Sequence, residues 1–271
     1  MPAVRAREEE LDGRPVLVRE ADATGAGDVL YVHGVPTSSA DWVPFLERTG
    51  GVAPDLPGFG RSGKRASDAY TMARYDGWLE AFLDARGIGD LSLVVHDWGA
   101  VGLLTAMRLP ERVRRLVIMN AAPLLPGYRW HRIARAWRTP VVGELLMGAA
   151  SRRTISLLSR EANVTPGPLP RPMLDEVARD LDQGTQRAIL ALYRSAPPEA
   201  LADAGRDLHR LTSPALVVWG DRDPYVPASF ADAYAAALGG PAEVLHLPDA
   251  GHWPWLDRPD VVGTVADFLG A

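Results

Sequence analysis

Asp97, one of the two aspartates Asp221 and Asp223, and His252 are residues whose types and order along the chain could carry out nucleophilic catalysis. Each stands just after a short apolar run, where a predicted parallel strand ends and a loop begins. Because the C-terminal ends of parallel strands meet at one edge of a sheet, a single sheet can gather all three side chains. A carboxylate is ionised at neutral pH and can attack a saturated carbon that bears a leaving group. The set predicts a hydrolase that forms an aspartyl ester and then releases it with water.

The sequence VVHDWGA, residues 94–100, predicts a strand that runs through a sharp turn into a helix. Gly99 and Ala100 are small, as a tight turn with a closely packed helix requires. We expect Asp97 at the apex of this turn, near a helix N-terminus that favours negative charge. The plainer alternative is that Asp97 only caps the helix, which is a common role for aspartate. Asp221, Asp223 and His252, which also follow predicted strands, favour the catalytic interpretation.

Short β-branched runs that alternate with helical spacing predict the elements that hold these residues. We expect strands at residues 15–19, 29–33, 91–96, 115–120, 215–219 and 243–246, and helices at 70–86 and 99–109. Nearly continuous apolar strands, each followed by a helix, are typical of a parallel sheet that is covered on both faces. The sequence therefore predicts an α/β fold.

The regular alternation stops after Asn120, and no strand is predicted between residues 123 and 213. Helical patterns occupy residues 129–138, 141–160, 173–183 and 186–194. The simplest explanation is a helical cap, residues 123–213, that is inserted into a core domain of residues 1–122 and 214–271. We expect this cap to lie over the strand ends and to shape the pocket.

Charge and composition bound the partners and the compartment of the protein. The chain has 29 basic and 34 acidic residues, a net charge of −5, which argues against nucleic acid or an anionic membrane as partner. The absence of cysteine excludes disulfides and thiolate metal sites. The N-terminal residues lack the apolar run of a signal peptide, and no apolar stretch reaches membrane-spanning length. We expect a cytoplasmic protein.

Four motifs carry a resemblance to the α/β-hydrolase superfamily. They are HGVPTSS at residues 33–39, DLPGFGRS at residues 55–62, the turn at Asp97, and GHWP at residues 251–254. With these motifs in this order, the chain resembles the epoxide hydrolase and haloalkane dehalogenase branch across nearly its whole length. The resemblance implies the α/β-hydrolase fold, a mostly parallel central sheet with helices on both faces and an inserted helical cap. It also implies hydrolysis without a metal or an organic cofactor.

The same resemblance assigns roles to individual residues. The backbone N–H groups of Val35 and Trp98 would hold the oxyanion that forms when water attacks the ester. Neutral His252 would deprotonate that water, and an acid would orient the imidazole. In the resembling enzymes this acid usually lies three residues past a glycine, which here is Asp223, with Asp221 as the competing candidate.

The leaving group separates the two activities of this branch. Epoxide hydrolases typically use two cap tyrosines that hydrogen-bond the ring oxygen, whereas a halide needs only weak donors, often indole or amide N–H groups. Tyr193 has the position of the second cap tyrosine, but the first has no counterpart near residues 141–145. The other candidates for the pocket wall are Tyr128, Trp130, His131 and Trp137. We expect an epoxide hydrolase that gives a vicinal diol, with a haloalkane dehalogenase as the alternative.

The expected partners are water and a small apolar epoxide or haloalkane, and a homodimer is one expected assembly. A different class of function is a catalytically silent receptor that binds a ligand on the same fold. The complete set of Asp97, Asp223 and His252 argues against this class, because a protein that only binds has no need of a nucleophile and a base.

Overall fold

The computed structural model describes residues 2–165, 167 and 169–270 and contains one eight-stranded sheet. The strands are β1 (Arg5–Leu11), β2 (Arg14–Ala21), β3 (Val29–Val32), β4 (Gly51–Pro54), β5 (Leu91–His96), β6 (Val113–Met119), β7 (Ala215–Gly220) and β8 (Ala242–Leu247). Their order across the sheet is β1-β2-β4-β3-β5-β6-β7-β8. Only β2 runs against its neighbours, and every pair from β4 to β8 is parallel. The predicted α/β fold with a mostly parallel sheet is confirmed.

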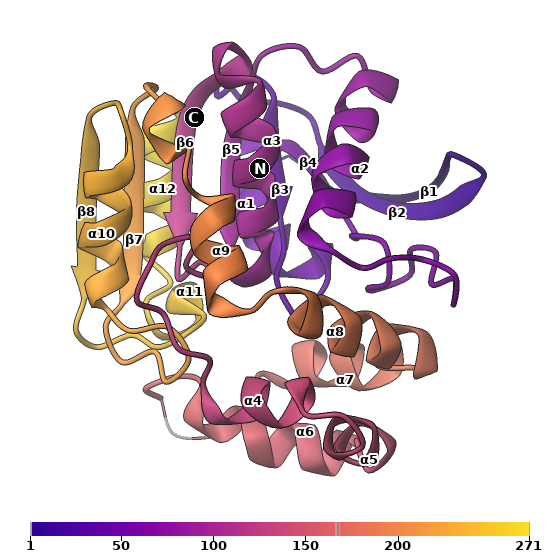
Figure 1. Ribbon diagram of the computed structural model, residues 1–271. Coiled ribbons are helices and arrows are strands. Elements are labelled where there is room, and N and C mark those ends of the chain that lie inside the picture. The colour runs from indigo at the N-terminus through magenta and orange to yellow at the C-terminus, as the bar shows by residue number, and fades with distance from the viewer. Residues whose placement is uncertain (1, 166, 168, 271) are drawn as a thin grey trace.

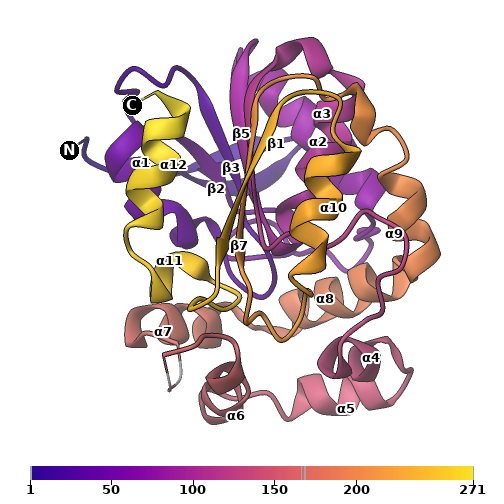
Figure 2. The same cartoon turned by 90° about the vertical axis from the view of Figure 1, so that its left-hand side faces the viewer.

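Successive residues of the central strands point to opposite faces of the sheet and enter two separate apolar clusters. In β3, Leu30 and Val32 belong to one cluster, whereas Val29 and Tyr31 belong to the other. Helices α2 (Met72–Ala85), α3 (Val101–Arg108) and α10 (Ser229–Ala237) cover the first face. Helices α1 (Val43–Thr49), α11 (Pro254–Asp257) and α12 (Val261–Leu269) cover the second face, as Figure 2 shows with the sheet between the two layers.

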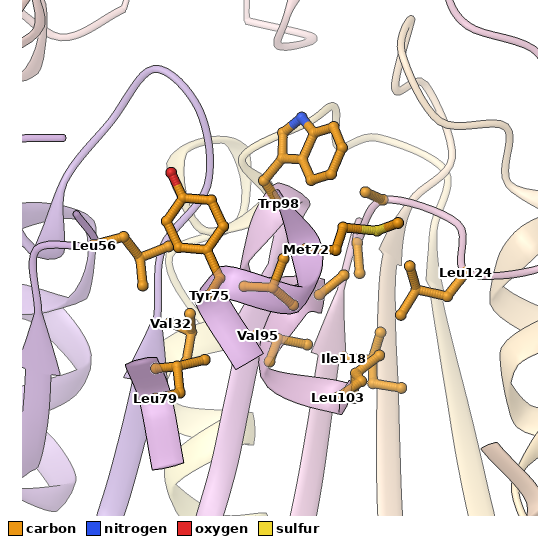
Figure 3. Close-up of a cluster of buried hydrophobic side chains, with 14 of the residues drawn as sticks. Val32, Leu56, Met72, Tyr75, Leu79, Val95, Trp98, Leu103, Ile118 and Leu124 are labelled. Atoms are coloured by element: carbon orange, nitrogen blue, oxygen red, sulfur yellow. The ribbon is translucent and has the colours of Figure 1, made fainter. Parts of the chain in front are cut away.

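The first cluster lies directly beneath the turn that follows β5 (Figure 3). Val32, Val95 and Ile118 come from three neighbouring strands, and Leu79 and Leu103 pack on them from α2 and α3. All five side chains are buried. A close-packed base of this kind holds the strand ends in fixed positions, because protein interiors leave little room for side chains to shift.

Between β6 and β7 the described residues form helices and no strand. The helices are α4 (Arg132–Arg138), α5 (Val142–Gly148), α6 (Arg152–Leu158), α7 (Arg171–Asp180), α8 (Gln183–Ser195) and α9 (Pro198–Ala204). In Figure 1 α4 to α8 lie together beyond one end of the sheet, and α9 leads the chain back toward it. We propose that residues 1–122 and 214–271 form the core domain and that residues 123–213 form the cap.

Short 3-10 helices complete the described secondary structure. They are η1 (Ser39–Trp42), η2 (Asp97–Ala100), η3 (Pro110–Arg112), η4 (Ser159–Glu161) and η5 (Leu208–Arg210). One predicted helix, residues 141–160, is two helices in the structure, because α5 ends at Gly148 and α6 starts anew. The Ser151 hydroxyl accepts from the backbone N–H of Thr154, and the Thr154 hydroxyl accepts from the backbone N–H of Ser151. This reciprocal cap favours a helix start at that point.

Candidate active site

The turn after β5 holds Asp97 in a backbone conformation that non-glycine residues seldom adopt. Its φ angle is 49°, in the left-handed region. The turn is also closely packed, since a Cβ atom on Gly99 would lie 2.0 Å from the carbonyl oxygen of Val32. A strained residue kept in place by tight surroundings is characteristic of functional sites. The predicted strand, sharp turn and helix are thus all present, with Asp97 at the apex.

The structure brings Asp97, Asp223 and His252 together at the C-terminal ends of β5, β7 and β8. The Nδ1 atom of His252 lies 2.8 Å from Oδ2 of Asp223, and its Nε2 atom lies 3.7 Å from Oδ2 of Asp97. The imidazole is 2% exposed, so water does not screen these contacts. With Nδ1 donating to Asp223, Nε2 is the free basic nitrogen and faces the Asp97 carboxylate.

Asp223 is fixed by three donors in addition to the histidine. The amide of Asn120 donates to Oδ2 at 2.8 Å, and the backbone N–H groups of Tyr225 and Val226 donate to Oδ1 at 2.7 and 3.2 Å. Asp221, the competing acid, instead accepts from His246 at 2.6 Å. The local sequence could not reveal the part played by Asn120, because this contact joins residues 103 positions apart.

Burial and charge act in opposite directions on the two groups that would react. Burial lowers the pKa of His252, but the carboxylates of Asp223 and Asp97 outweigh it, so the pKa is raised above 6.5. Burial raises the pKa of Asp97 above 3.8, although His252 and the backbone N–H groups of Val35 and Trp98 favour its ionised form. A carboxylate with little hydration is a stronger nucleophile than one in water.

The loop between β3 and η1 presents a backbone donor to Asp97. The N–H group of Val35 donates to Oδ1 of Asp97 at 2.8 Å. A side chain at position 34 would be excluded, because a Cβ atom on Gly34 would lie 2.5 Å from the same oxygen. The N–H groups of Val35 and Trp98 therefore stand where an oxyanion on the Asp97 carboxyl carbon would develop.

Two other buried histidines hold the backbone around this site. His33 accepts from the N–H of Leu56 at 2.9 Å through Nε2, and its Nδ1 donates to the carbonyl of Gly34 at 2.8 Å. His96 lies 2.7 Å from the carbonyl oxygen of His252 through Nε2. Both side chains are fully buried, and both contact backbone rather than the Asp97 carboxylate.

An apolar cavity of about 510 Å³ opens onto the Asp97 carboxylate and His252. Among the predicted wall residues, Trp137, Tyr193 and Val35 line it. Aliphatic side chains of α5, α6 and the following segment form a large part of the remaining wall. A cavity of this size and character suits a small apolar molecule, and Asp97 and His252 are two of the polar groups on its wall.

Tyr128, Trp130 and Trp98 are not among the described residues that line this cavity. Trp130 stacks on Trp98 with ring centroids 5.5 Å apart, and its indole N–H donates to the carbonyl of Ala196. The hydroxyl of Tyr128 donates to the carbonyl of Tyr225. We expected Tyr128 and Trp130 at the wall, but the structure places both behind it, with their polar atoms already used by backbone.

The indole nitrogen of Trp98 has no hydrogen-bond partner among the described residues, although it is buried. Edge-on contact with Tyr193, at 5.1 Å between ring centroids, places it directly behind the cavity wall. Burial and the nearby Asp97 carboxylate raise the pKa of Tyr193 well above 10, so this phenol stays protonated. Trp253, whose buried indole nitrogen also has no partner among the described residues, lines the cavity together with Tyr193 and Tyr225, so the site contains both indole and phenol donors near the nucleophile.

Three further aromatic residues line the cavity: Tyr225, His131 and Trp253. Of these, His131 was a candidate from the sequence, whereas Tyr225 and Trp253 were not predicted. Tyr225 lies edge-on to His252 at 4.9 Å and contacts His131 at 4.8 Å. Burial lowers the pKa of His131 to about 4, which keeps it neutral. The local sequence does not indicate that these three side chains meet at the cavity, because they come from three distant segments of the chain.

The described residues contain no group of three or more His, Cys, Asp or Glu side chains that could hold a metal ion. None of the described helices is both long enough and apolar enough to cross a bilayer.

Known proteins resemble this chain in both sequence and structure. A model of the α/β-hydrolase fold family matches residues 29–259. A haloalkane dehalogenase of Mesorhizobium japonicum is 32% identical over 92% of this chain and 86% of its own length, and one of Bradyrhizobium diazoefficiens is 30% identical over 95% and 91%. The crystal structure of a haloalkane dehalogenase from Bradyrhizobium elkani superposes with a TM-score of 0.84 at 26% identity, over 98% of both chains. The chain is an enzyme of the α/β-hydrolase family and belongs to the branch that contains the haloalkane dehalogenases.

Proposed function

We propose that this protein is a haloalkane dehalogenase, which converts a small apolar haloalkane and water into an alcohol, a halide ion and a proton. The observation that carries the proposal is the buried indole N–H of Trp98, which lies next to the nucleophile and makes no hydrogen bond of normal geometry with the described residues, although it is near enough to the Tyr193 hydroxyl to lower the pKa of that phenol. A buried donor without a partner costs about 1–3 kcal/mol, which a halide at this position would recover. The relatives named above support the same activity.

In the first step, a carboxylate oxygen of Asp97 attacks the carbon that bears the halogen. The new C–O bond gives an alkyl ester of Asp97, and the C–X electron pair leaves with the halide. Trp98 stands next to Asp97 and can donate to the halide, and the hydroxyl of Tyr193 can supply a second donor. Trp98 and Tyr193 are both buried, so these donors act at a low local dielectric.

In the second step, Nε2 of His252 takes a proton from a water molecule, which attacks the carboxyl carbon of the ester. The negative charge that develops on the carbonyl oxygen faces the N–H groups of Val35 and Trp98. Collapse of this intermediate breaks the bond to the alkoxide, which takes the proton from His252 and leaves as the alcohol. Asp223 stabilises the transient imidazolium.

The sequence led us to expect an epoxide hydrolase, and the relatives do not support that choice. Opening an epoxide releases an alkoxide, which calls for two acidic donors. Tyr193 faces the cavity as one phenol. Tyr128 donates to a backbone carbonyl and does not line the cavity, whereas Tyr225 lines it edge-on to His252. The choice of a halide over an epoxide oxygen therefore rests on the relatives and on Trp98 rather than on a missing phenol.

The proposal is tested by assaying two substrates with the same enzyme preparation. Incubation with 1,2-dibromoethane should release bromide and alcohol, whereas incubation with styrene oxide should give no diol above the uncatalysed rate. Diol formation without bromide release would overturn the proposal in favour of an epoxide hydrolase. Turnover of neither substrate, with a bound bromoalkane seen by calorimetry, would indicate a receptor.

The role of Asp97 is tested by a single turnover in water enriched in oxygen-18. The mechanism places one solvent oxygen in the Asp97 carboxylate, so the peptide that contains this residue should gain two mass units (~2 Da). The Asp97→Asn variant should release no halide. Label found only in the alcohol would mean that water attacks the substrate directly, and the ester would then be excluded.

A further inference from the structure

The six large apolar side chains that are exposed among the described residues all lie between residues 141 and 158. We refer to these six as the cap patch. They are Val141, Val142, Leu145, Leu146, Leu157 and Leu158, with exposures from 43% to 69%. Isolated exposed apolar residues are ordinary, but a whole set confined to one short segment marks an interaction surface.

Helix α5 shows the reverse of the usual amphipathic pattern. Gly143 and Met147 are buried, while the positions that point outward, Leu145 and Leu146, are leucines. A surface helix normally presents polar side chains to water and buries its apolar stripe. Here the helix buries its small residue and presents the large aliphatic ones. In Figure 1 and Figure 2, α5 and α6 lie at the end of the molecule that is farthest from the sheet.

The segment that carries the cap patch is strongly basic, although the chain as a whole is acidic. Residues 129–160 contain seven arginines and one glutamate, a net charge of +6, so the rest of the chain carries −11. Four of the exposed arginines form no ion pair with the described residues: Arg129, Arg135, Arg153 and Arg160. Arg153 is one helical turn before Leu157, so both occupy one face of α6. The overall charge of −5 conceals this segregation.

The cap patch is continuous with the mouth of the apolar cavity. Leu146, Leu157 and Leu158 are exposed to solvent and also line the cavity that reaches Asp97. A molecule that leaves an apolar phase in contact with these leucines could reach the nucleophile without crossing bulk water. This continuity distinguishes the cap patch from a surface that serves only for assembly.

We propose that the cap docks peripherally on an anionic lipid bilayer, with α5 and α6 lying against the headgroups and the cavity mouth facing the acyl chains. Aliphatic side chains on one face, flanked by arginines, are the features by which interfacial helices bind such bilayers. A second copy of the chain fits less well, because a symmetric contact would bring two segments of +6 together. That the substrate arrives from the lipid rests on the proposed function, but the docking itself does not.

Vesicle co-sedimentation of the full-length protein tests the docking without any measurement of turnover. At low salt, binding to equal mixtures of phosphatidylcholine and phosphatidylglycerol should exceed binding to phosphatidylcholine alone by about tenfold or more, and salt should weaken it. The variant Val141→Gln/Leu145→Gln should lose most of this binding. Its kcat on a water-soluble substrate should be unchanged, because neither residue lines the cavity.

Charge is tested with two variants that remove the same number of arginines. Arg153→Gln/Arg160→Gln should weaken binding to the anionic vesicles, whereas Arg48→Gln/Arg74→Gln should leave it nearly unchanged. Arg48 and Arg74 are also exposed and unpaired among the described residues, but they lie on α1 and α2. Equal losses in both variants would mean that only net charge matters, and the proposed orientation would be wrong.

A fluorescent label reports the contact directly and does not depend on a loss of function. The chain has no cysteine, so Leu145→Cys and the control Glu47→Cys can each carry one polarity-sensitive dye. The dye at position 145 should shift to shorter wavelength with anionic vesicles, and the dye at position 47 should not. No shift at 145, or self-association in light scattering that Val141→Gln/Leu145→Gln abolishes, would overturn the proposal.

Discussion

The indole of Trp98 is the side chain whose removal best distinguishes a halide site from a purely structural cluster. Trp98→Phe keeps the ring contacts with Tyr193 and Trp130 but removes the donor that lacks a partner. A hydrogen bond to a charged group contributes about 1.5–3 kcal/mol, so kcat/KM for a bromoalkane should fall roughly 10- to 150-fold. Steady-state bromide release measures this change.

Trp130→Phe is the matched control for that variant. Trp130 stacks on Trp98, but its N–H already donates to Ala196 and it does not line the cavity. Its loss should lower stability by about 1 kcal/mol and leave kcat/KM within about twofold. A Trp98→Phe enzyme as active as the wild type would show that another group holds the halide, with Tyr193 as the first candidate.

Asp223 should set both the rate and the pH dependence of the reaction. The pKa of His252 is raised above 6.5 by Asp223 and Asp97, and only neutral His252 can take a proton. Activity should therefore fall as pH decreases through this raised pKa. Asp223→Asn removes a charge that favours the imidazolium, so this acid limb should move to lower pH. The rate at the optimum should fall about 10³- to 10⁴-fold, because the imidazole loses its orientation.

Asp221→Asn is the control for charge removal in the same loop. Asp221 contacts His246 and not His252, so this variant should keep both the rate and the acid limb. Profiles of kcat/KM against pH for Asp223→Asn and Asp221→Asn measure the position of the acid limb in each variant. An acid limb that stays in place in Asp223→Asn would contradict the assignment of this limb to His252.

At the scale of elements, the turn between β5 and α3 depends on the absence of a side chain at Gly99. A Cβ atom there would lie 2.0 Å from the backbone oxygen of Val32, which cannot rotate away. Gly99→Ala should therefore destabilise the protein by about 3 kcal/mol and displace Asp97. Urea unfolding midpoints, with halide release as a second measurement, test this prediction.

The glycine inside α2 provides the opposite case. Gly77 is exposed, and no atom lies within 4 Å of the position that its Cβ would occupy. Gly77→Ala should stabilise the protein by about 0.5–1 kcal/mol, because alanine is the better helix former. If Gly99→Ala and Gly77→Ala changed the free energy of unfolding equally, close packing at Gly99 would not be what limits substitution in the turn.

The sequence predicted the central strands β5, β6 and β7 closely. Their apolar, β-branched runs report burial on both faces, and each begins and ends within two residues of the expected positions. Strand β1 was not predicted, because its residues are mostly charged and exposed at the edge of the sheet. Strand β4 was not predicted either, because it begins at Gly51 and ends at Pro54, two residue types that weaken the signal of a strand.

The order of Asp97, Asp223 and His252 was readable for the same reason, because each follows a strand with a strong signal. The composition of the cavity wall could not be read from the sequence in the same way. Asn120 and Tyr225 reach the site through contacts between distant segments, and nothing in their local sequence reports such contacts. Tyr128 and Trp130 were expected at the wall, but backbone acceptors hold them behind it.

The stability of the whole molecule should depend on pH through the buried carboxyl group of Asp41, which the proposed mechanism does not use. Asp41 lies in η1 and is 7% exposed, and its Oδ2 atom has no hydrogen-bond partner among the described residues. Burial raises the pKa of Asp41 to about 7, although Thr37 and Trp253 act in the opposite direction. The folded protein therefore holds a proton that the unfolded chain loses near pH 4.

The sign of the resulting pH dependence follows from linkage. Below about pH 4, Asp41 is protonated in both states and costs nothing. Between about pH 4 and 7 only the unfolded state gains by ionisation, so Asp41 destabilises the fold increasingly as pH rises, by up to about 4 kcal/mol. Asp41→Asn cannot ionise, so its stability relative to the wild type should increase over this window and level off above pH 7.

Urea unfolding of the wild type and Asp41→Asn at a series of pH values measures this difference, with Asp90→Asn as control. Asp90 is exposed in the loop before β5, so its neutralisation should change stability by a few tenths of a kcal/mol at most. A constant difference between Asp41→Asn and the wild type from pH 4 to 8 would mean that packing alone distinguishes them. A difference that grows with pH would show that the buried Asp41 carboxyl group lowers the free energy of unfolding. Asp41 lies close enough to the active site to raise the pKa of His252 as well.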